Sequence, residues 1–403
     1  MKRTFSLSGL LVPSGLALVA ATYGLVRLAT GLYLPDVQDE LGLGTAAAGL
    51  VSSGASLAYC LGALLGLVLA TRRARTLVVV AALTAGGGGL GLSVAPDAPT
   101  FAVLAVLASV GPGVVSPALV EILRRDPVVA GDPSAQSTVN AGTGPGLVVA
   151  GALALTLLPD WRAAWAWSGL LTLAVAALVL VAARGGETGR QAPGATLPRS
   201  WWSAHRRVVA ASLLLGAGSA AVWSYGRVVV LEAGGGTTTS LVAWIALGLG
   251  GTAVVATAGP LGRRTPRTAW TLTAGFTALA TLALGLGSGS AVVAVAACAV
   301  FGWGFVAATG ALIAWTVDVD PGRGASGTAL LFVVLVLGQA LGSALAGALL
   351  GGAGHEAAFA ASAFLTAVGA VVAAPVRVRR LRVADAATPG RPRGARGPSR
   401  PCG

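Results

Sequence analysis

The spacing of apolar runs constrains this chain more than any other feature of its sequence. A bilayer core about 30 Å thick needs about 20 apolar residues per helix. Twelve such runs follow one another, at 10–34, 45–70, 76–95, 101–123, 138–158, 163–183, 208–231, 240–262, 268–287, 290–315, 325–350 and 357–375. The last loops are short and rich in glycine, so eleven helices are the alternative. The sequence predicts an all-α integral membrane protein of twelve transmembrane helices.

The composition agrees with a membrane protein. Charged residues make up 10% of the chain and hydrophobic residues 55%, whereas a soluble protein has about 25% charged residues. The formal charge of +13, taken alone, would suggest a nucleic-acid partner. The arginines instead lie mostly in short loops and in the C-terminal tail, which is the pattern of membrane topology. We therefore expect no nucleic-acid partner.

The charge asymmetry of the loops orients the chain. The loops predicted on one side carry the carboxylates of Asp36, Asp39, Glu40, Asp97, Asp160, Glu232 and Glu356. All 27 Lys and Arg residues except Arg27, Arg162 and Arg227 fall on the other side or in its tails. Because cytoplasmic loops hold the excess of Lys and Arg, that side is cytoplasmic. The sequence predicts a multi-pass plasma-membrane protein with both termini in the cytoplasm.

One interruption divides the chain into two halves. Residues 184–207 are rich in glycine, proline and charge, and they predict a cytoplasmic linker between six-helix halves at 1–183 and 208–376. The aromatic end of this segment suits either a stretch lying at the membrane interface or a plain linker with an anchor. Residues 377–403 are rich in Arg, Pro and Gly and predict a disordered basic tail beside the lipid.

Corresponding motifs recur in the two halves of the chain. Tyr23-Gly24-Leu25-Val26-Arg27 corresponds to Trp223-Ser224-Tyr225-Gly226-Arg227. The basic turn at 72–75 corresponds to the one at 263–267, and Glu121 corresponds to Asp318. A parallel repeat of six helices places a pseudo-twofold axis along the membrane normal, which is the plan of one large transporter fold.

Several motifs resemble the major facilitator superfamily. The acidic segment 34–42 is similar to that family's first outer loop. Residues 66–75 are similar to its loop between helices two and three, which is expected to read Gly-x-x-x-Asp-Arg-x-Gly-Arg-Lys. Here Ala70 stands in place of the acid and Arg73 in place of the second glycine. The resemblance implies alternating access around a central cavity lined chiefly by helices 1, 4, 7 and 10.

Finer motifs point to a subgroup. Tyr23-Gly24-x-x-Arg27 in helix 1 and Gly338-Gln339-x-x-Gly342 in helix 11 most resemble the bacterial YbfB/YjiJ-type carriers. Gly142-Thr143-Gly144-Pro145 partly resembles the helix 5 element of antiporter branches. The resemblance does not identify a solute.

Charges inside apolar helices give the candidate solute site. A central arginine in a bilayer costs about 2.5–3.5 kcal/mol on insertion scales, so it usually faces a cavity or a partner. Arg27 and Arg227 each follow an aromatic by four residues, Tyr23 and Trp223, on one helical face, a geometry that permits a cation–π contact in each helix. We predict that both guanidinium groups converge on one space and that an anion bridges them. The alternative is that each arginine snorkels to the outer headgroups or forms a structural pair.

Two further expectations complete this site. Asp36 lies nine residues after Arg27 and is expected to point to the opposite helix face. Glu232 lies five residues after Arg227 and is also expected off its face, so that neither arginine has a local carboxylate. Gln339 offers an amide within an apolar helix, either as a packing hydrogen bond or as a cavity contact.

Charges at the predicted cytoplasmic ends suggest a gate. We expect Glu121 to approach the basic turn at 72–75, and Asp318 to approach the turn at 263–267, when the cytoplasmic side closes. The alternative is that both acids are ordinary interfacial carboxylates in water. The predicted gating residues are Arg72, Arg73, Arg75, Glu121, Arg263, Arg264, Arg267 and Asp318.

No residue set predicts catalysis. His205 and His355 lie in separate loops, and the three cysteines have no metal-ligand spacing. We expect no enzymatic activity, no metal and no cofactor. No carboxylate falls in the middle of a predicted helix, so coupling to H⁺ rests on the resemblance alone.

The sequence therefore predicts a secondary transporter that exports or exchanges a small organic solute. The alternatives are an importer of an organic anion, and a carrier-derived receptor or scaffold that moves nothing. The expected partners are the solute, an anion being one class, and the lipid bilayer.

Overall fold

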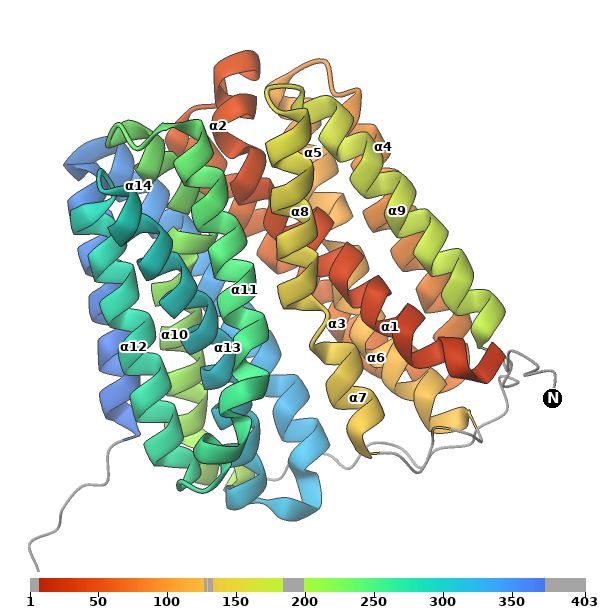
Figure 1. Ribbon diagram of the computed structural model, residues 1–403. Helices are drawn as coiled ribbons and strands as arrows, with labels where there is room; N and C mark the ends of the chain where they lie inside the picture. Colours follow the sequence, from red (N-terminus) through yellow and green to blue (C-terminus); the bar gives the residue numbers. More distant parts are fainter. Residues whose placement is uncertain (1–6, 127–128, 130–132, 184–198, 374–403) are drawn as a thin grey trace, which may run out of the picture.

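The computed structural model describes residues 7–126, 129, 133–183 and 199–373, which are helical almost throughout and contain no strand (Figure 1). The N-terminal group comprises α1 (Leu11–Val19), η2 (Ala20–Leu28), α2 (Ala29–Leu41), α3 (Thr45–Ala81), η3 (Ala82–Gly86), α4 (Gly87–Ser93), α5 (Ala98–Ala108), α6 (Val110–Arg125), α7 (Pro133–Asn140), α8 (Thr143–Leu157) and α9 (Trp161–Ala182). The C-terminal group comprises α10 (Arg199–Glu232), α11 (Gly236–Gly262), α12 (Pro266–Gly287), α13 (Ala291–Val319) and α14 (Gly324–Val372). The predicted tail and residues 184–198 of the predicted linker lie outside the described residues.

Within the described residues, ten helical segments are long and apolar enough to cross a membrane. Two of them, Thr45–Ser93 and Gly327–Val372, contain 49 and 46 residues. Straight helices of these lengths would measure about 74 and 69 Å, more than twice the bilayer core. Each is broken once: Arg73 leaves the helical region (φ −138°, ψ 40°), and Gly354 has φ 85° and ψ 174°. The second break requires glycine, because side chains disfavour that backbone conformation.

Two expected boundaries differ from the structure. The acidic segment predicted as a loop forms the last turns of α2, which ends at Leu41 and is followed by Gly42 in the left-handed conformation (φ 67°). This glycine closes the helix by donating its N–H to the carbonyl of Gln38. At the other boundary, α10 begins at Arg199, before the predicted helix start at 208. The Trp201 and His205 rings stack there, with centroids 3.7 Å apart, and stabilise the added turns.

The loops separate the charges onto two ends of the molecule. We call the upper end in Figure 1 the acidic face; it holds the end of α2, the loop before α5 and the end of α10, with Asp36, Asp97 and Glu232. We call the lower end the basic face; it holds the break within α3 and the loop between α11 and α12, which carry the two basic turns. This alternation follows the charge pattern of the sequence.

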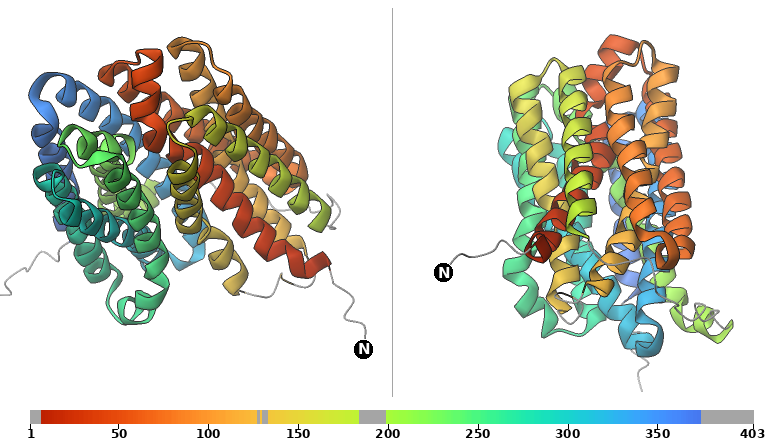
Figure 2. Two further views of the ribbon diagram at one scale, coloured as in Figure 1. Left: turned by 45° about the horizontal axis from the view of Figure 1, so that its top comes forward. Right: turned by 90° about the vertical axis from the view of Figure 1, so that its right-hand side faces the viewer.

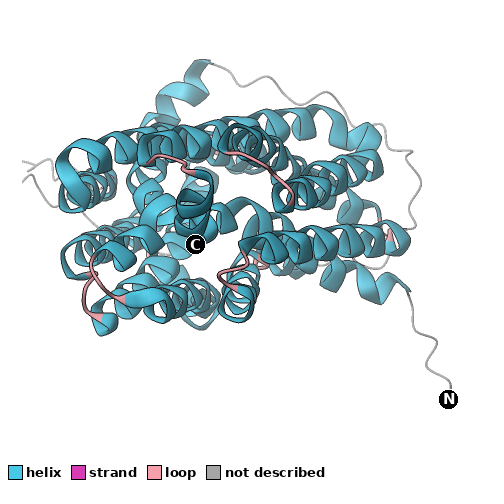
Figure 3. Ribbon diagram, turned by 90° about the horizontal axis from the view of Figure 1, so that it is seen from above, coloured by secondary structure: helices cyan, strands magenta, loops and turns pink. Residues whose placement is uncertain are grey.

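The two groups lie side by side and meet along three pairs of helices. Extensive packing joins α2 to α10, α3 to α14 and α8 to α11, and the helices are seen end-on as one bundle in Figure 3. Among the described elements, α6 and α7 pack substantially only against the N-terminal group. Toward the basic face α7 and α13 diverge (Figures 1 and 2). The tightest contacts between the groups are therefore found toward the acidic face.

Candidate functional site

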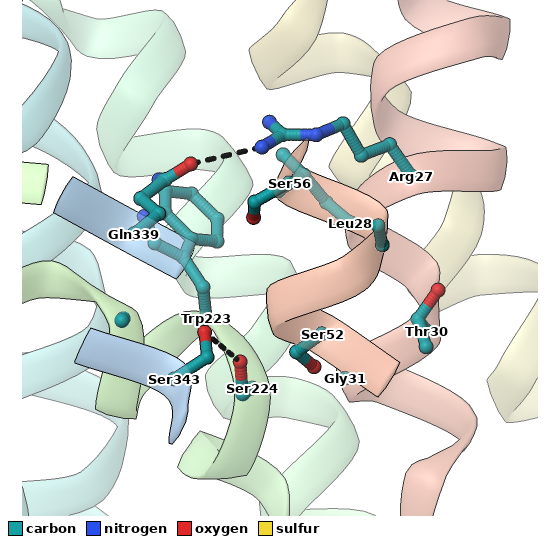
Figure 4. Close-up of a pocket in the computed structure, with 12 residues that line it drawn as sticks. Arg27, Leu28, Thr30, Gly31, Ser52, Ser56, Trp223, Ser224, Gln339 and Ser343 are labelled. Carbon is teal, nitrogen blue, oxygen red and sulfur yellow. Dashed lines mark hydrogen bonds between the residues drawn. The ribbon is translucent and has the colours of Figure 1, made fainter. Parts of the chain in front are cut away.

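A small cavity lies between the two groups (Figure 4). Its polar lining residues are Arg27, Thr30, Ser52, Ser56, Trp223, Ser224, Gln339 and Ser343. The volume is about 40 Å³, which has room for about three water molecules. An organic solute does not fit in this conformation, so the cavity must widen before one binds.

Arg27 reaches from the N-terminal group into this cavity and contacts the C-terminal group. Its Nη2 donates to Oε1 of Gln339 at 2.9 Å (Figure 4). Its guanidinium carbon lies 4.5 Å from the centre of the Tyr59 ring, as a cation–π contact. The expected aromatic partner was Tyr23. That expectation is wrong because residues 20–28 are π-helical, and a π-helix places i and i+5, rather than i and i+4, one above the other.

Tyr23 supports the site indirectly, through its contact with Tyr59. Its hydroxyl is 2.8 Å from that of Tyr59 and 3.0 Å from Oγ of Ser116. The two tyrosine rings meet edge to face, with centroids 5.8 Å apart. Tyr59 is buried, so these contacts fix the ring on which the Arg27 guanidinium rests.

Trp223 provides the aromatic wall of the cavity. Its ring packs edge to face against Phe301 and Phe305, with centroids 5.4 and 5.2 Å away. Its indole Nε1 is buried and has no acceptor among the described residues. Trp223 therefore joins the cavity to an apolar aromatic cluster.

Arg227 lies outside the cavity, in the contact between the two groups. Its Nη1 pairs with Oδ2 of Asp36 and donates to the carbonyl of Leu32 at 2.8 Å, while its Nε donates to Ser240 Oγ at 3.2 Å. The Arg227 side chain is 1% exposed and that of Asp36 17%. The expectation that no carboxylate reaches Arg227 is wrong, because Asp36 is supplied by the opposite group. Arg27 and Arg227 therefore have separate partners and do not share one space in this conformation.

Close backbone contacts surround this ion pair. A Cβ on Gly31 would lie 2.0 Å from the carbonyl oxygen of Trp223, which no side chain tolerates. The Tyr225 hydroxyl donates to the carbonyl of Thr45 at 2.9 Å, and a Cβ on Gly49 would meet that hydroxyl at 2.7 Å. We call these contacts, together with Arg227 and Asp36, the acidic-face latch.

The predicted gating residues lie near the basic face and do not form the expected pairs here. Glu121 is buried and binds its own helix, through Arg124 at 2.7 Å and through Arg125. Arg125 also donates to the carbonyl of Thr71, and Arg75 to that of Ala183. These contacts hold the basic turn of α3 within the N-terminal group.

The corresponding turn of the C-terminal group is more open. Arg263, Arg264 and Asp318 are exposed, as are Arg72 and Arg73 in the first turn. Arg267 lies 5.5 Å from the Trp315 ring. Asp318 makes no ion pair with any described residue. Because the acidic face is the closed one, pairing across a closed basic face stays a prediction.

The sequence reasoning found part of this site. Arg27, Trp223 and Gln339 line one cavity, as expected of cavity contacts. Tyr59, the serines of α3 and the role of Asp36 were missed. The chain has only four tyrosines, and one inside the apolar run 45–70 was a signal that could have been followed.

Comparisons with known proteins agree with this architecture. The sequence model of the Major Facilitator Superfamily matches residues 16–331. A comparison with curated proteins finds no match.

Solved structures resemble the whole described chain. The nucleoside transporter NupG has a TM-score of 0.75 at 14% identity, covering 92% of this chain and 98% of its own. A bacterial homologue of the human lysosomal transporter Spinster, inward-facing and unoccupied, has a TM-score of 0.70 at 14% identity, covering 92% and 96%. The human organic anion transporter MFSD10 has a TM-score of 0.65 at 14% identity, covering 91% and 99%. At these identities the likeness concerns the fold alone.

Proposed function

The chain belongs to the major facilitator superfamily, and we propose that it is a secondary transporter that carries a small organic solute across the plasma membrane by alternating access. One observation carries this proposal. A polar cavity with a single charged residue lies between two helical groups that are latched at one face. Such a cavity needs only a change in the contact between the groups to open toward either side.

We propose twelve membrane crossings in two halves of six, at 1–183 and 208–376. The support is that the two longest apolar segments are each long enough for two crossings and are each broken once, at Arg73 and at Gly354. The other eight segments each cross once. The linker 184–207 and the tail 377–403 would then lie on the basic face.

We propose that the basic face is cytoplasmic, as the excess of arginine there indicates. In a chain with Cys60, Cys298 and Cys402 replaced by alanine, Asp39→Cys should react with a membrane-impermeant maleimide in intact cells. Arg264→Cys should react only after permeabilisation. Both positions are exposed, so accessibility to water does not distinguish them. Labelling of Arg264→Cys in intact cells would contradict the orientation.

Efflux or exchange is the direction we propose. The support is the helix 5 motif at 142–145, which resembles antiporter branches. In the structure this motif touches the C-terminal group, because a Cβ on Gly144 would lie 2.5 Å from Thr252 Oγ1. The resemblance to YbfB/YjiJ-type carriers and the pairing of Glu121 and Asp318 with the basic turns at a closed basic face stay predictions.

Flux into proteoliposomes tests the function. Purified protein should accelerate uptake of its solute into vesicles preloaded with the same unlabelled solute, because exchange needs no coupling ion. Protein that binds a solute but exchanges none would support the scaffold alternative instead.

A further inference from the structure

We propose that the cavity binds an organic monoanion, and that Gln339 holds the place of its carboxylate on Arg27 while the solute is absent. This inference rests on the proposed transport function and names the class of its solute. It concerns one side-chain contact, the hydrogen bond between the Arg27 guanidinium and the Gln339 amide oxygen at 2.9 Å.

The charge of the cavity indicates which class of solute it binds. Arg27 is the one charged residue that lines it, and no carboxylate is among the lining residues. Within the described part of the chain, Arg27 makes no ion pair. A fixed positive charge in a membrane protein interior is costly unless an opposite charge accompanies it. One cation is balanced by one negative charge, so a monoanion fits better than a dianion, a neutral solute or a cation.

The hydrogen-bonding groups favour acceptor oxygens. A guanidinium presents five N–H donors in a plane, which match the two oxygens of a carboxylate. The hydroxyls of Thr30, Ser52 and Ser56 line the same space. The cavity therefore offers a surplus of donors, which a carboxylate satisfies.

The aromatic wall specifies the rest of the solute. Trp223, Phe301 and Phe305 form one packed cluster. Trp223 lines the cavity, and the wall behind it is apolar. A solute whose carboxylate meets Arg27 would place an apolar body against this wall, so we assign a monocarboxylate with a ring-sized apolar part.

Gln339 links solute binding to the contact between the two groups. Its amide oxygen accepts from Arg27 where a carboxylate oxygen would accept, and it comes from the opposite group (Figure 4). An incoming carboxylate displaces this neutral acceptor because a charge-assisted, bidentate contact is stronger. Displacement removes one hydrogen bond between the groups, so binding loosens the closed conformation.

The test compares benzoate, benzamide and benzylammonium as probes. Each is titrated into purified protein at constant sodium chloride concentration, and the thermal unfolding midpoint is measured. We expect benzoate to raise the midpoint of the wild type and the other two to leave it unchanged. An equal response to benzamide, a larger response to benzylammonium, or no response to benzoate would each overturn the inference.

Two variants test whether benzoate binds at Arg27 and Gln339. Gln339→Glu places a permanent carboxylate on Arg27, so the variant should unfold at or above the wild-type midpoint without ligand and bind benzoate at least tenfold more weakly. Arg27→Gln should also lose the benzoate response. Gln136→Glu makes the same charge change in α7, where the Gln136 amide donates to Oδ1 of Asn140 at 3.0 Å and does not line the cavity, and should keep the response. Full benzoate binding by Gln339→Glu would overturn the inference.

The outcomes separate this inference from the transport function. If benzoate binds as described and no carboxylate is exchanged in proteoliposomes, the class of ligand stands and transport fails. If a neutral or cationic solute is exchanged and benzoate does not bind, transport stands and the monoanion site fails.

Discussion

Asp36→Asn should open the acidic face of this transporter. The substitution removes the negative partner of Arg227, whose side chain is 1% exposed in the closed conformation. Leaving a buried charge without its partner costs about 3–5 kcal/mol. In the open conformation Arg227 reaches water and the loss is small. Because each 1.4 kcal/mol changes a population ratio about tenfold, the closed state should become about a hundredfold to a few thousandfold less populated relative to the open one.

Distance measurements between spin labels follow this shift directly. Thr156→Cys at the end of α8 and Thr238→Cys at the start of α11 are exposed positions on opposite groups at the acidic face. We expect the distance between their labels to lengthen in Asp36→Asn. Asp39→Asn removes an exposed carboxylate from the same helix and should leave the distance unchanged. An unchanged distance in Asp36→Asn would mean that the ion pair does not hold the face closed.

The charge-swapped double variant Asp36→Arg with Arg227→Asp gives a second check. It restores an ion pair across the same contact, so it should recover part of the short distance that either single substitution loses. Equal opening in the single and double variants would indicate that Arg227 acts through its hydrogen bonds to Leu32 and Ser240 instead of through its charge.

Gly31→Ala should open the same face by a steric route. The added methyl would lie 2.0 Å from the carbonyl oxygen of Trp223, so α2 and α10 could not approach as closely as they do. Overpacking of this kind costs about 1–3 kcal/mol, which corresponds to a shift of about fivefold to a hundredfold toward the open conformation. The open conformation itself gains a better helix former at this position.

Spin-label distances and thermal unfolding together test this prediction. We expect the label distance at the acidic face to lengthen in Gly31→Ala with little loss of folded protein. Gly275→Ala is the matched control, because a Cβ at Gly275 meets nothing within 4 Å. If Gly31→Ala keeps the short distance, the close contact between α2 and α10 does not govern closure.

The membrane architecture was readable from the sequence because it depends on local composition. Apolar runs and loop charges do not depend on which helices meet, so the order of helices and the separation of acidic from basic loops follow from them. The start of α10 was missed because the stacking of Trp201 on His205 overrides a polar composition. The sequence underestimates the length of α2 because a proline and several acids after an apolar run predict a loop, whereas Pro35 lies inside the helix.

The sequence predicts a site residue only where its side chain contrasts with the rest of its own helix. Arg27 and Gln339 stand out as polar groups in apolar runs, and the structure joins them. The partner of Arg227 does not follow from the acids near it in the sequence, because Asp36 lies 191 residues away along the chain and belongs to the other group. The cation–π partner of Arg27 was misjudged because the π-helical stretch is not visible in hydropathy.

Labelling of one cysteine in the cavity from each side of the membrane tests alternating access most directly. Ser52 lines the cavity, and Ser52→Cys in the cysteine-free chain should react with an impermeant maleimide in both right-side-out and inverted vesicles. Adding Gly31→Ala should raise labelling from the acidic face and lower it from the basic face. Leu57→Cys, at a position 52% exposed on the surface of the same helix, should remain unreactive in the lipid. Labelling from one face only, or an increase from both faces together, would contradict the account.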